Sequence, residues 1–135
     1  MKPRATHPLP SETELRILKI LWERGTATAK AIHEQLNAGA AKPRVVTTTM
    51  KLLEIMMGKR LVKRDESTWP HQYRACVARD AILGRLVTQT LNDVFDQSAS
   101  QFMLAALESG AVSPGDIAEI KTMLETYEGK RNDAQ

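Results

Sequence analysis

The sequence predicts a mostly α-helical fold with one small β-hairpin, and three observations support this prediction. Apolar residues recur at intervals of three and four over most of the 135 residues, which is typical of helices that bury one face. Serine or threonine stands before several of these stretches, where its side chain can cap a helix start. In "LVKRDE" and "HQYRACV" the apolar period changes to two, as expected for short strands.

The composition fits a folded cytoplasmic protein. Cys76 is the single cysteine, so no internal disulfide can form and a reducing compartment is expected. No stretch approaches the roughly 20 apolar residues that a membrane-spanning helix requires, and "MKPRATHPLP" lacks the apolar region of a signal peptide. We therefore expect a cytoplasmic protein without membrane insertion, and a flexible tail over residues 1–10.

Two short helices are predicted at the start of the folded region. The first begins after Ser11, which has the spacing of a capping box with Glu14, and it ends at Gly25. Its apolar face consists of Leu15, Leu18, Leu21 and Trp22. The second begins after Thr28 and stops at the "NAG" that follows it. Its apolar face consists of Ala29, Ile32 and Leu36.

A third helix and the hairpin complete the first domain. The apolar face of this helix is expected to consist of Val46, Thr49, Leu52, Leu53, Met56 and Met57. The two strands follow, with "DESTWP" as the tip between them. Three helices and then a hairpin, over residues 11–77, is the element order of a winged helix-turn-helix domain.

The remainder of the chain reads as a three-helix C-terminal region over residues 78–128, followed by a flexible tail over 129–135. One helix starts at Arg79, and the other two start after the capping residues Ser98 and Ser113. Their apolar stripes have little else to pack against, so the simplest partner is a second copy of the chain. The residues expected to form this homodimer are Leu83, Leu86, Val87, Leu91, Val94, Phe102, Ile117, Ile120 and Leu124.

Charge is divided unevenly along the chain. Residues 1–77 carry 14 Lys and Arg against 7 Asp and Glu, whereas residues 78–135 carry 5 against 9. This asymmetry favours a polyanionic partner, double-stranded DNA, for the first domain. A positive surplus of this size is also compatible with simple solubility.

The third helix has the residues that a DNA-reading helix needs. Outside its apolar face stand Thr47, Thr48 and Lys51, whose hydroxyl, methyl and ammonium groups can contact base edges. The residues expected to bind phosphates are Arg44, Lys59, Arg60, Lys63 and Arg64. Two simpler interpretations stay open: the threonines cap the helix, and the basic residues form a solvated face. Glu54 and Ile55 on the same outer face do not favour phosphate contact.

No catalytic residues, metal site or cofactor are predicted. His7, His33 and His71 are far apart and have no Cys or carboxylate at ligand spacing, and no local motif indicates an enzyme. Cys76 is interpreted as a small buried residue. Trp69, at the hairpin tip, either plugs the core or contacts DNA sugars.

The chain from Ser11 to about Glu128 resembles the penicillinase repressor family of the BlaI/MecI/CopY type. The first helix carries the run of that family as Ser11, Glu14, Leu18, Leu21 and Trp22. Thr47 and Thr48 stand at its threonine-rich helix start, "GKRLVKRD" at its entry into the wing, and Tyr73 at its wing tyrosine. The stretch "FDQSASQFMLAALESGAVSPGDIAEIKTMLE" is similar to its dimerisation region.

The resemblance implies a winged-helix homodimer that represses transcription from a dyad-symmetric operator. In the best-known members, a membrane metalloprotease-type sensor leads to cleavage of an Asn-Phe bond. Ala105-Ala106 occupies that position here, which argues against this partner. Arg60 replaces a glycine, Ile55 replaces a frequent arginine, and Trp69-Pro70 replaces a Gly-Arg. The copper-sensing branch carries several C-terminal cysteines that this chain lacks.

Two other functions remain compatible with the sequence. One is a winged-helix protein-interaction module that does not bind DNA, and the other is a regulator that senses an effector ligand in a pocket between the domains.

Overall fold

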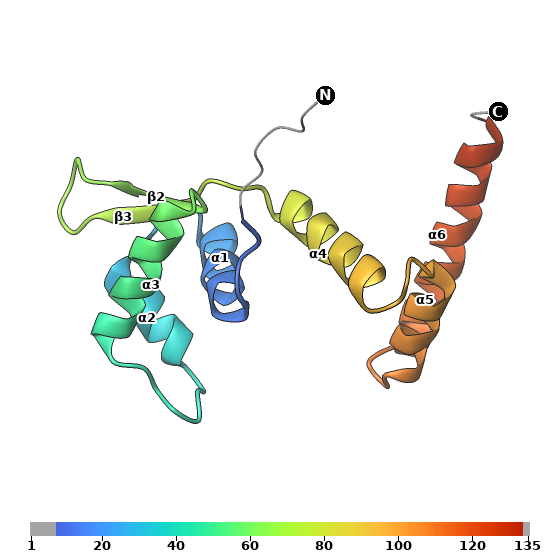
Figure 1. The fold of residues 1–135 in the computed structure, drawn as a ribbon, viewed down its shortest axis with the longest axis horizontal. Helices are drawn as coiled ribbons and strands as arrows, with labels where there is room; N and C mark the ends of the chain where they lie inside the picture. The colour runs from blue at the N-terminus through green and yellow to red at the C-terminus, as the bar shows by residue number, and fades with distance from the viewer. Residues whose placement is uncertain (1–7, 134–135) are drawn as a thin grey trace. The chain divides into compact units, whose positions relative to one another are not determined.

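The computed structural model describes residues 8–133, and the chain divides into two compact units, residues 1–87 and 88–135 (Figure 1). The predicted N-terminal tail lies outside the described residues up to position 7, and Pro10 is buried. The predicted domain boundary after residue 77 stays a prediction.

Three helices build the first unit: α1 (Glu12–Arg24), α2 (Ala29–Asn37) and α3 (Val46–Gly58). The predicted capping box of α1 is confirmed, because Glu14 N–H donates to Ser11 Oγ at 3.2 Å and Ser11 N–H donates to Glu14 Oε1 at 2.8 Å. The cap of α2 is confirmed too, since Ala31 N–H donates to Thr28 Oγ1 at 3.1 Å. Local hydrogen bonds therefore fix where the first two helices begin.

A three-stranded antiparallel sheet of order β1-β3-β2 accompanies these helices. Its strands are β1 (Ala27–Thr28), β2 (Val62–Asp65) and β3 (Gln72–Ala75). The predicted hairpin is β2–β3, and "DESTWP" joins the two strands as expected. β1 was not predicted, because two residues are too short to show an alternating pattern. In the sequence β1 lies between α1 and α2, and it pairs with β3.

The core lies between the three helices and the sheet. Its buried residues are Ile17, Leu18, Ile20, Leu21, Ala27, Ile32, Leu36, Leu53, Met56, Leu61, Val62 and Tyr73. Trp22 packs against this cluster, and its Nε1–H donates to Val77 O at 2.9 Å. The prediction that Val46 belongs to the buried face is wrong, since 51% of Val46 is exposed. Val46 is the first residue of α3, and the buried face of this helix begins at Thr49.

The C-terminus of α3 forms a Schellman motif that positions the hairpin. Arg60 N–H donates to Met57 O at 3.0 Å, and Leu61 N–H donates to Met56 O at 2.9 Å. Leu61 and Met56 are both fully buried, which supplies the apolar contact that accompanies this motif. Arg60 occupies the left-handed position with φ of 62°, where glycine is the favoured residue.

The second unit is helical, with α4 (Arg79–Asp93) leading into it from the first unit, then α5 (Ala99–Glu108) and α6 (Pro114–Asp133). Both predicted caps are confirmed: Gln101 N–H donates to Ser98 Oγ at 3.2 Å, and Asp116 N–H donates to Ser113 Oγ at 3.0 Å. α6 continues past residue 128, the predicted end of the domain; residues 134 and 135 of the predicted tail lie outside the described residues.

This architecture confirms the predicted fold class, which is mostly α with a winged helix-turn-helix domain. The hairpin β2–β3 is the wing, and α3 follows α2 in the position of the reading helix.

Replacing Arg60 with glycine is expected to stabilise the protein. A side chain in the left-handed region costs about 1–2 kcal/mol, partly offset by the greater freedom that glycine gives the unfolded chain. The expected gain in the free energy of unfolding is about 0.5–1 kcal/mol, measured by urea denaturation.

The matched control is Gly25→Ala, which places a side chain at a φ of 83°. It is expected to lower the free energy of unfolding by about 1 kcal/mol. A loss of stability in Arg60→Gly would show that the backbone at this position is unstrained.

Candidate nucleic-acid interface

The helix α3 presents two faces of different chemistry. Thr49, Leu53 and Met56 are fully buried on the inner face. Thr47 and Thr48, which immediately precede Thr49, are exposed. Lys51 on the next turn is exposed as well. The structure therefore places the three residues predicted to read bases on the solvent side of α3.

The threonines do not cap α3. Its N-cap is Val45, which makes no side-chain cap hydrogen bond, and Thr48 N–H donates to the Val45 carbonyl at 3.1 Å. The capping interpretation of the threonine triplet is therefore wrong. The hydroxyls of Thr47 and Thr48 are left at the surface beside the N-terminus of a helix, where the helix dipole favours negative charge.

A polar network sets the position of α3 against α2. The side-chain amide of Asn37 donates to Arg44 O at 2.8 Å and accepts from Arg44 N–H at 3.0 Å, which closes the loop between the helices. These two bonds fix the amide orientation, so Asn37 Nδ2 must donate to His33 Nε2, 3.3 Å away. His33 Nδ1–H then donates to the buried Thr49 Oγ1 at 2.7 Å. The predicted helix residue Thr49 is thus held in the core by a histidine.

The five residues predicted to bind phosphates have different surroundings. Arg60 and Lys63 are exposed. Arg44 is half-buried, and its Nη2 donates to Thr13 Oγ1 at 3.4 Å. Lys59 Nζ lies 2.8 Å from Glu14 Oε1, whose side chain is only 3% exposed. This salt bridge joins the start of α1 to the end of α3, which favours a structural role for Lys59.

Glu14 is held in its charged form by these contacts. Burial raises the pKa of the Glu14 carboxyl, but hydrogen bonds from Lys59 and Ser11 outweigh that effect and leave the pKa below its ordinary value of 4.5. The contribution of this carboxylate to stability is therefore present above about pH 4.5 and is lost as the pH falls through the lowered pKa.

The wing carries a basic residue that the sequence analysis missed. Arg74 lies directly across from Lys63 in the β2–β3 pairing, and both side chains are exposed. Like charges on facing residues destabilise a sheet by roughly 0.2–1 kcal/mol. The alternation in "HQYRA" places Arg74 on the face opposite to Tyr73, so the sequence pattern could have identified Arg74 as an exposed basic residue of the wing. A bound anion would relieve this repulsion.

Arg64, the other basic residue of β2, is already engaged in contacts with neighbouring side chains. A hydrogen bond with the buried Tyr73 raises the pKa of Arg64, and its Nη2 lies 3.3 Å from Glu66 Oε1 in an exposed ion pair. The Arg64 Nε–H finds no hydrogen-bond partner among residues 8–133.

Apolar side chains are interspersed with these polar ones. Val45 is 66% exposed and Trp69 is 84% exposed. Trp69 is therefore not a core plug; its ring contacts His71 edge-on, with 4.8 Å between ring centroids. Cys76 is exposed, so the expectation of a buried cysteine is wrong. It follows the last residue of β3 and lies on the exposed side of the alternation, whereas its neighbours Ala75 and Val77 pack against the core.

The residues predicted to form the dimer stay accessible in the single chain. Among the described side chains of residues 88–132, none is buried. Val94 is 67% exposed, Leu124 56% and Val87 43%. Ile117 is exposed to a lesser degree, and Leu83, Leu86, Leu91, Phe102 and Ile120 are half-buried. Phe102 packs edge-on against Phe95, with 5.2 Å between ring centroids.

Over the part of the chain that the structure describes, no group of three or more His, Cys, Asp or Glu residues is placed to bind a metal ion. In that same part, no helix has the length and apolar character needed to cross a membrane. His7 lies outside the described residues.

The fold and this surface define a DNA-binding protein of the winged helix-turn-helix class. The family model described as penicillinase repressor matches residues 10–126, so the chain belongs to the penicillinase repressor family, a family of transcriptional repressors. The resemblance found in the sequence is thereby confirmed. A comparison with curated proteins finds no significant match.

Replacing Lys59 with glutamine is expected to destabilise the protein. The buried Glu14 carboxylate loses its charged partner, and hydrogen bonds to charged groups contribute about 1.5–3 kcal/mol when buried, less at a site where the lysine is partly exposed. We expect a loss of about 1 kcal/mol at pH 7 that shrinks below about pH 4.5, measured by urea denaturation across pH.

The control is Lys63→Gln, which removes the same charge from an exposed site and should change stability by less than about 0.5 kcal/mol. On DNA the order reverses. Lys63→Gln should reduce the slope of log affinity against log salt by about one, whereas Lys59→Gln should leave it unchanged. If both variants reduce the salt slope equally, Lys59 also binds a phosphate.

Proposed function

We propose that this repressor is a homodimer that binds a dyad-symmetric DNA operator through α3 and the wing. The observation that carries the proposal is the division of the "TTT" triplet: Thr49 is fully buried, whereas Thr47 and Thr48 are exposed beside Lys51. A helix with hydroxyl, methyl and ammonium groups at its solvent-facing start has the chemistry to contact base edges in the major groove.

The phosphate contacts in this proposal come from both sides of α3. Arg44 precedes the helix, and Arg60 follows it at the Schellman motif. On the wing, Lys63 and Arg64 are joined by Arg74. Backbone contacts of this kind fix the register of a protein on the duplex, while base contacts specify the sequence.

The dimer is supported by the solvent-accessible apolar residues of the second unit. Large apolar side chains on three helices, with none buried between residues 88 and 132, expose more apolar surface than a stable monomer usually tolerates. A two-fold partner contributes the same surface, so one set of residues covers another. The membrane-sensor partner is not part of the proposal: Ala105 and Ala106 lie within α5, and their role stays a prediction.

The function is tested by footprinting on the DNA that flanks the gene for this protein. Protection of two half-sites about one helical turn apart would support the proposal. If the protein changes the electrophoretic mobility of a partner protein but not that of promoter DNA at low salt, it is instead a protein-interaction module.

Replacing Thr48 with alanine is expected to weaken operator binding by roughly 1–3 kcal/mol, because the base contact of the hydroxyl is lost. Binding to random DNA should change far less, and this serves as the internal control. Fluorescence anisotropy on both duplexes measures the difference. An equal loss on both would assign Thr48 to the phosphate backbone.

Replacing Leu124 with glutamate is expected to convert the dimer into a monomer, because a charge would be buried without a partner. The matched control is Thr122→Glu on the opposite face of α6, which should leave the dimer intact. Sedimentation equilibrium measures the mass. A wild-type monomer at micromolar concentration would contradict the proposed assembly.

A further inference from the structure

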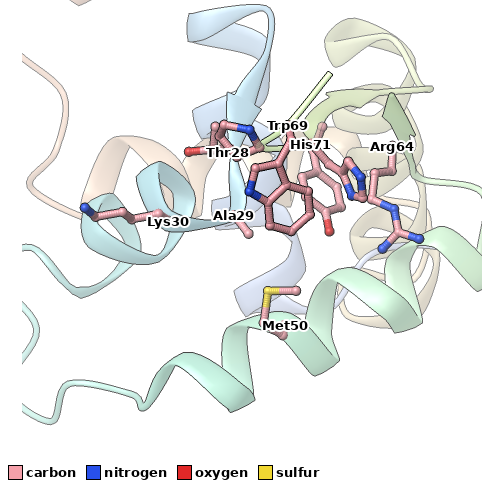
Figure 2. Close-up of a pocket in the computed structure, with 9 residues that line it drawn as sticks. Thr28, Ala29, Lys30, Met50, Arg64, Trp69 and His71 are labelled. Carbon is pink, nitrogen blue, oxygen red and sulfur yellow. The ribbon is translucent and has the colours of Figure 1, made fainter. Parts of the chain in front are cut away.

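A pocket opens in the first unit between the start of α2, the middle of α3 and the wing. Its volume is about 470 Å³, within the range of about 300–1,000 Å³ typical of small-molecule sites. Figure 2 shows the rings of Trp69 and His71 on one side of the pocket and the Met50 side chain facing them from α3. Lys30 and Arg64 stand at its two ends.

The walls of this pocket suit a flat aromatic group. Trp69 is 84% exposed and Met50 is 40% exposed, so both leave large apolar surfaces in water. Covering this surface contributes about 25 cal/mol per Å². A thioether also contacts an aromatic ring favourably. Ala29 and Pro70 add further apolar surface, while Thr28, His71 and Tyr73 contribute polar groups to the lining.

The Arg64 end of the pocket suits an anion. The Nε–H of Arg64 is buried and finds no hydrogen-bond partner in the described part of the chain. The same guanidinium has a side-chain hydrogen bond with Tyr73, and its Nη2 lies 3.3 and 3.5 Å from the two oxygens of the exposed Glu66 carboxylate. Exposed ion pairs of this kind contribute little. A carboxylate that displaces Glu66 could form with this guanidinium the bidentate pair that arginine favours. Lys30 lies at the opposite end, and its ammonium group points away from Arg64 (Figure 2).

We propose that this pocket binds a small planar aromatic carboxylate, with its ring between Trp69 and Met50 and its carboxylate on Arg64. Met50 belongs to the reading helix α3, and Trp69 and Arg64 belong to the wing. A ligand seated there alters the two elements that the proposed function places on DNA, so it acts as an effector that weakens operator binding. This second step rests on the proposed function, whereas ligand binding itself does not.

The test uses the full chain without DNA and three probes: 2-naphthoate, its neutral amide 2-naphthamide, and acetate. Titration calorimetry is expected to give an affinity for 2-naphthoate at least tenfold higher than for either of the others. The Met50 methyl resonance should shift with 2-naphthoate and stay unchanged with acetate. Equal binding of naphthoate and naphthamide would remove the role of Arg64, and equal binding of naphthoate and acetate would reduce the site to an adventitious anion. Either result overturns the proposal.

Two matched variants locate the site. Arg64→Gln is expected to lose the preference for naphthoate over naphthamide, whereas Lys63→Gln, the adjacent residue outside the pocket, should keep it. Met50→Ala is expected to weaken both aromatic probes at least fivefold and leaves the charges in place. Retention of full naphthoate binding in Arg64→Gln and in Met50→Ala would place the ligand elsewhere.

The effector role is tested separately by adding saturating 2-naphthoate to the operator complex, which should lower operator affinity at least fivefold. If naphthoate binds but operator affinity is unchanged, the effector role is wrong and the site stands. If the free protein binds naphthoate but no DNA, the proposed function fails and the site again stands. If DNA binds and naphthoate does not, the inference fails alone.

Discussion

The orientation of α3 depends on a short chain of hydrogen bonds from Asn37 through His33 to Thr49. The hydroxyl of Thr49 is fully buried, and a buried hydroxyl without a partner would cost about 1–3 kcal/mol. Its bond to His33, together with the burial of Leu53 and Met56 on the same face, therefore sets the rotation of α3 about its own axis. That rotation places Thr47 and Thr48 outward. The same amide of Asn37 closes the loop before α3, so the position of the helix start is set by the same group.

The fold could be predicted from the sequence because its signals are local. The caps at Ser11, Thr28, Ser98 and Ser113 lie within a few residues of the groups that they bond, and apolar period identifies each helix without tertiary information. The wing was predicted for the same reason. β1 escaped prediction because its pairing with β3 spans more than forty positions of sequence and involves only two residues.

The candidate interface was harder to predict, because several assignments depend on contacts between distant residues. Periodicity put Thr49 on the buried face, but nothing local showed that His33 would donate a hydrogen bond to its hydroxyl oxygen. Lys59 was grouped with the phosphate-binding residues because its sequence neighbours are basic, whereas its partner Glu14 lies on α1. Arg74 was missed because its importance comes from the residue across the sheet. Cys76 was expected to be buried, yet it lies on the exposed side of the strand alternation, between Ala75 and Val77, which pack against the core.

Thr28 belongs to two elements at once, and this gives the wing a mechanical connection to the helices. As part of β1 it pairs with Gln72 of β3, and as the N-cap of α2 it accepts from Ala31 N–H. A tilt of the hairpin relative to the helices would therefore disturb the first turn of α2 as well.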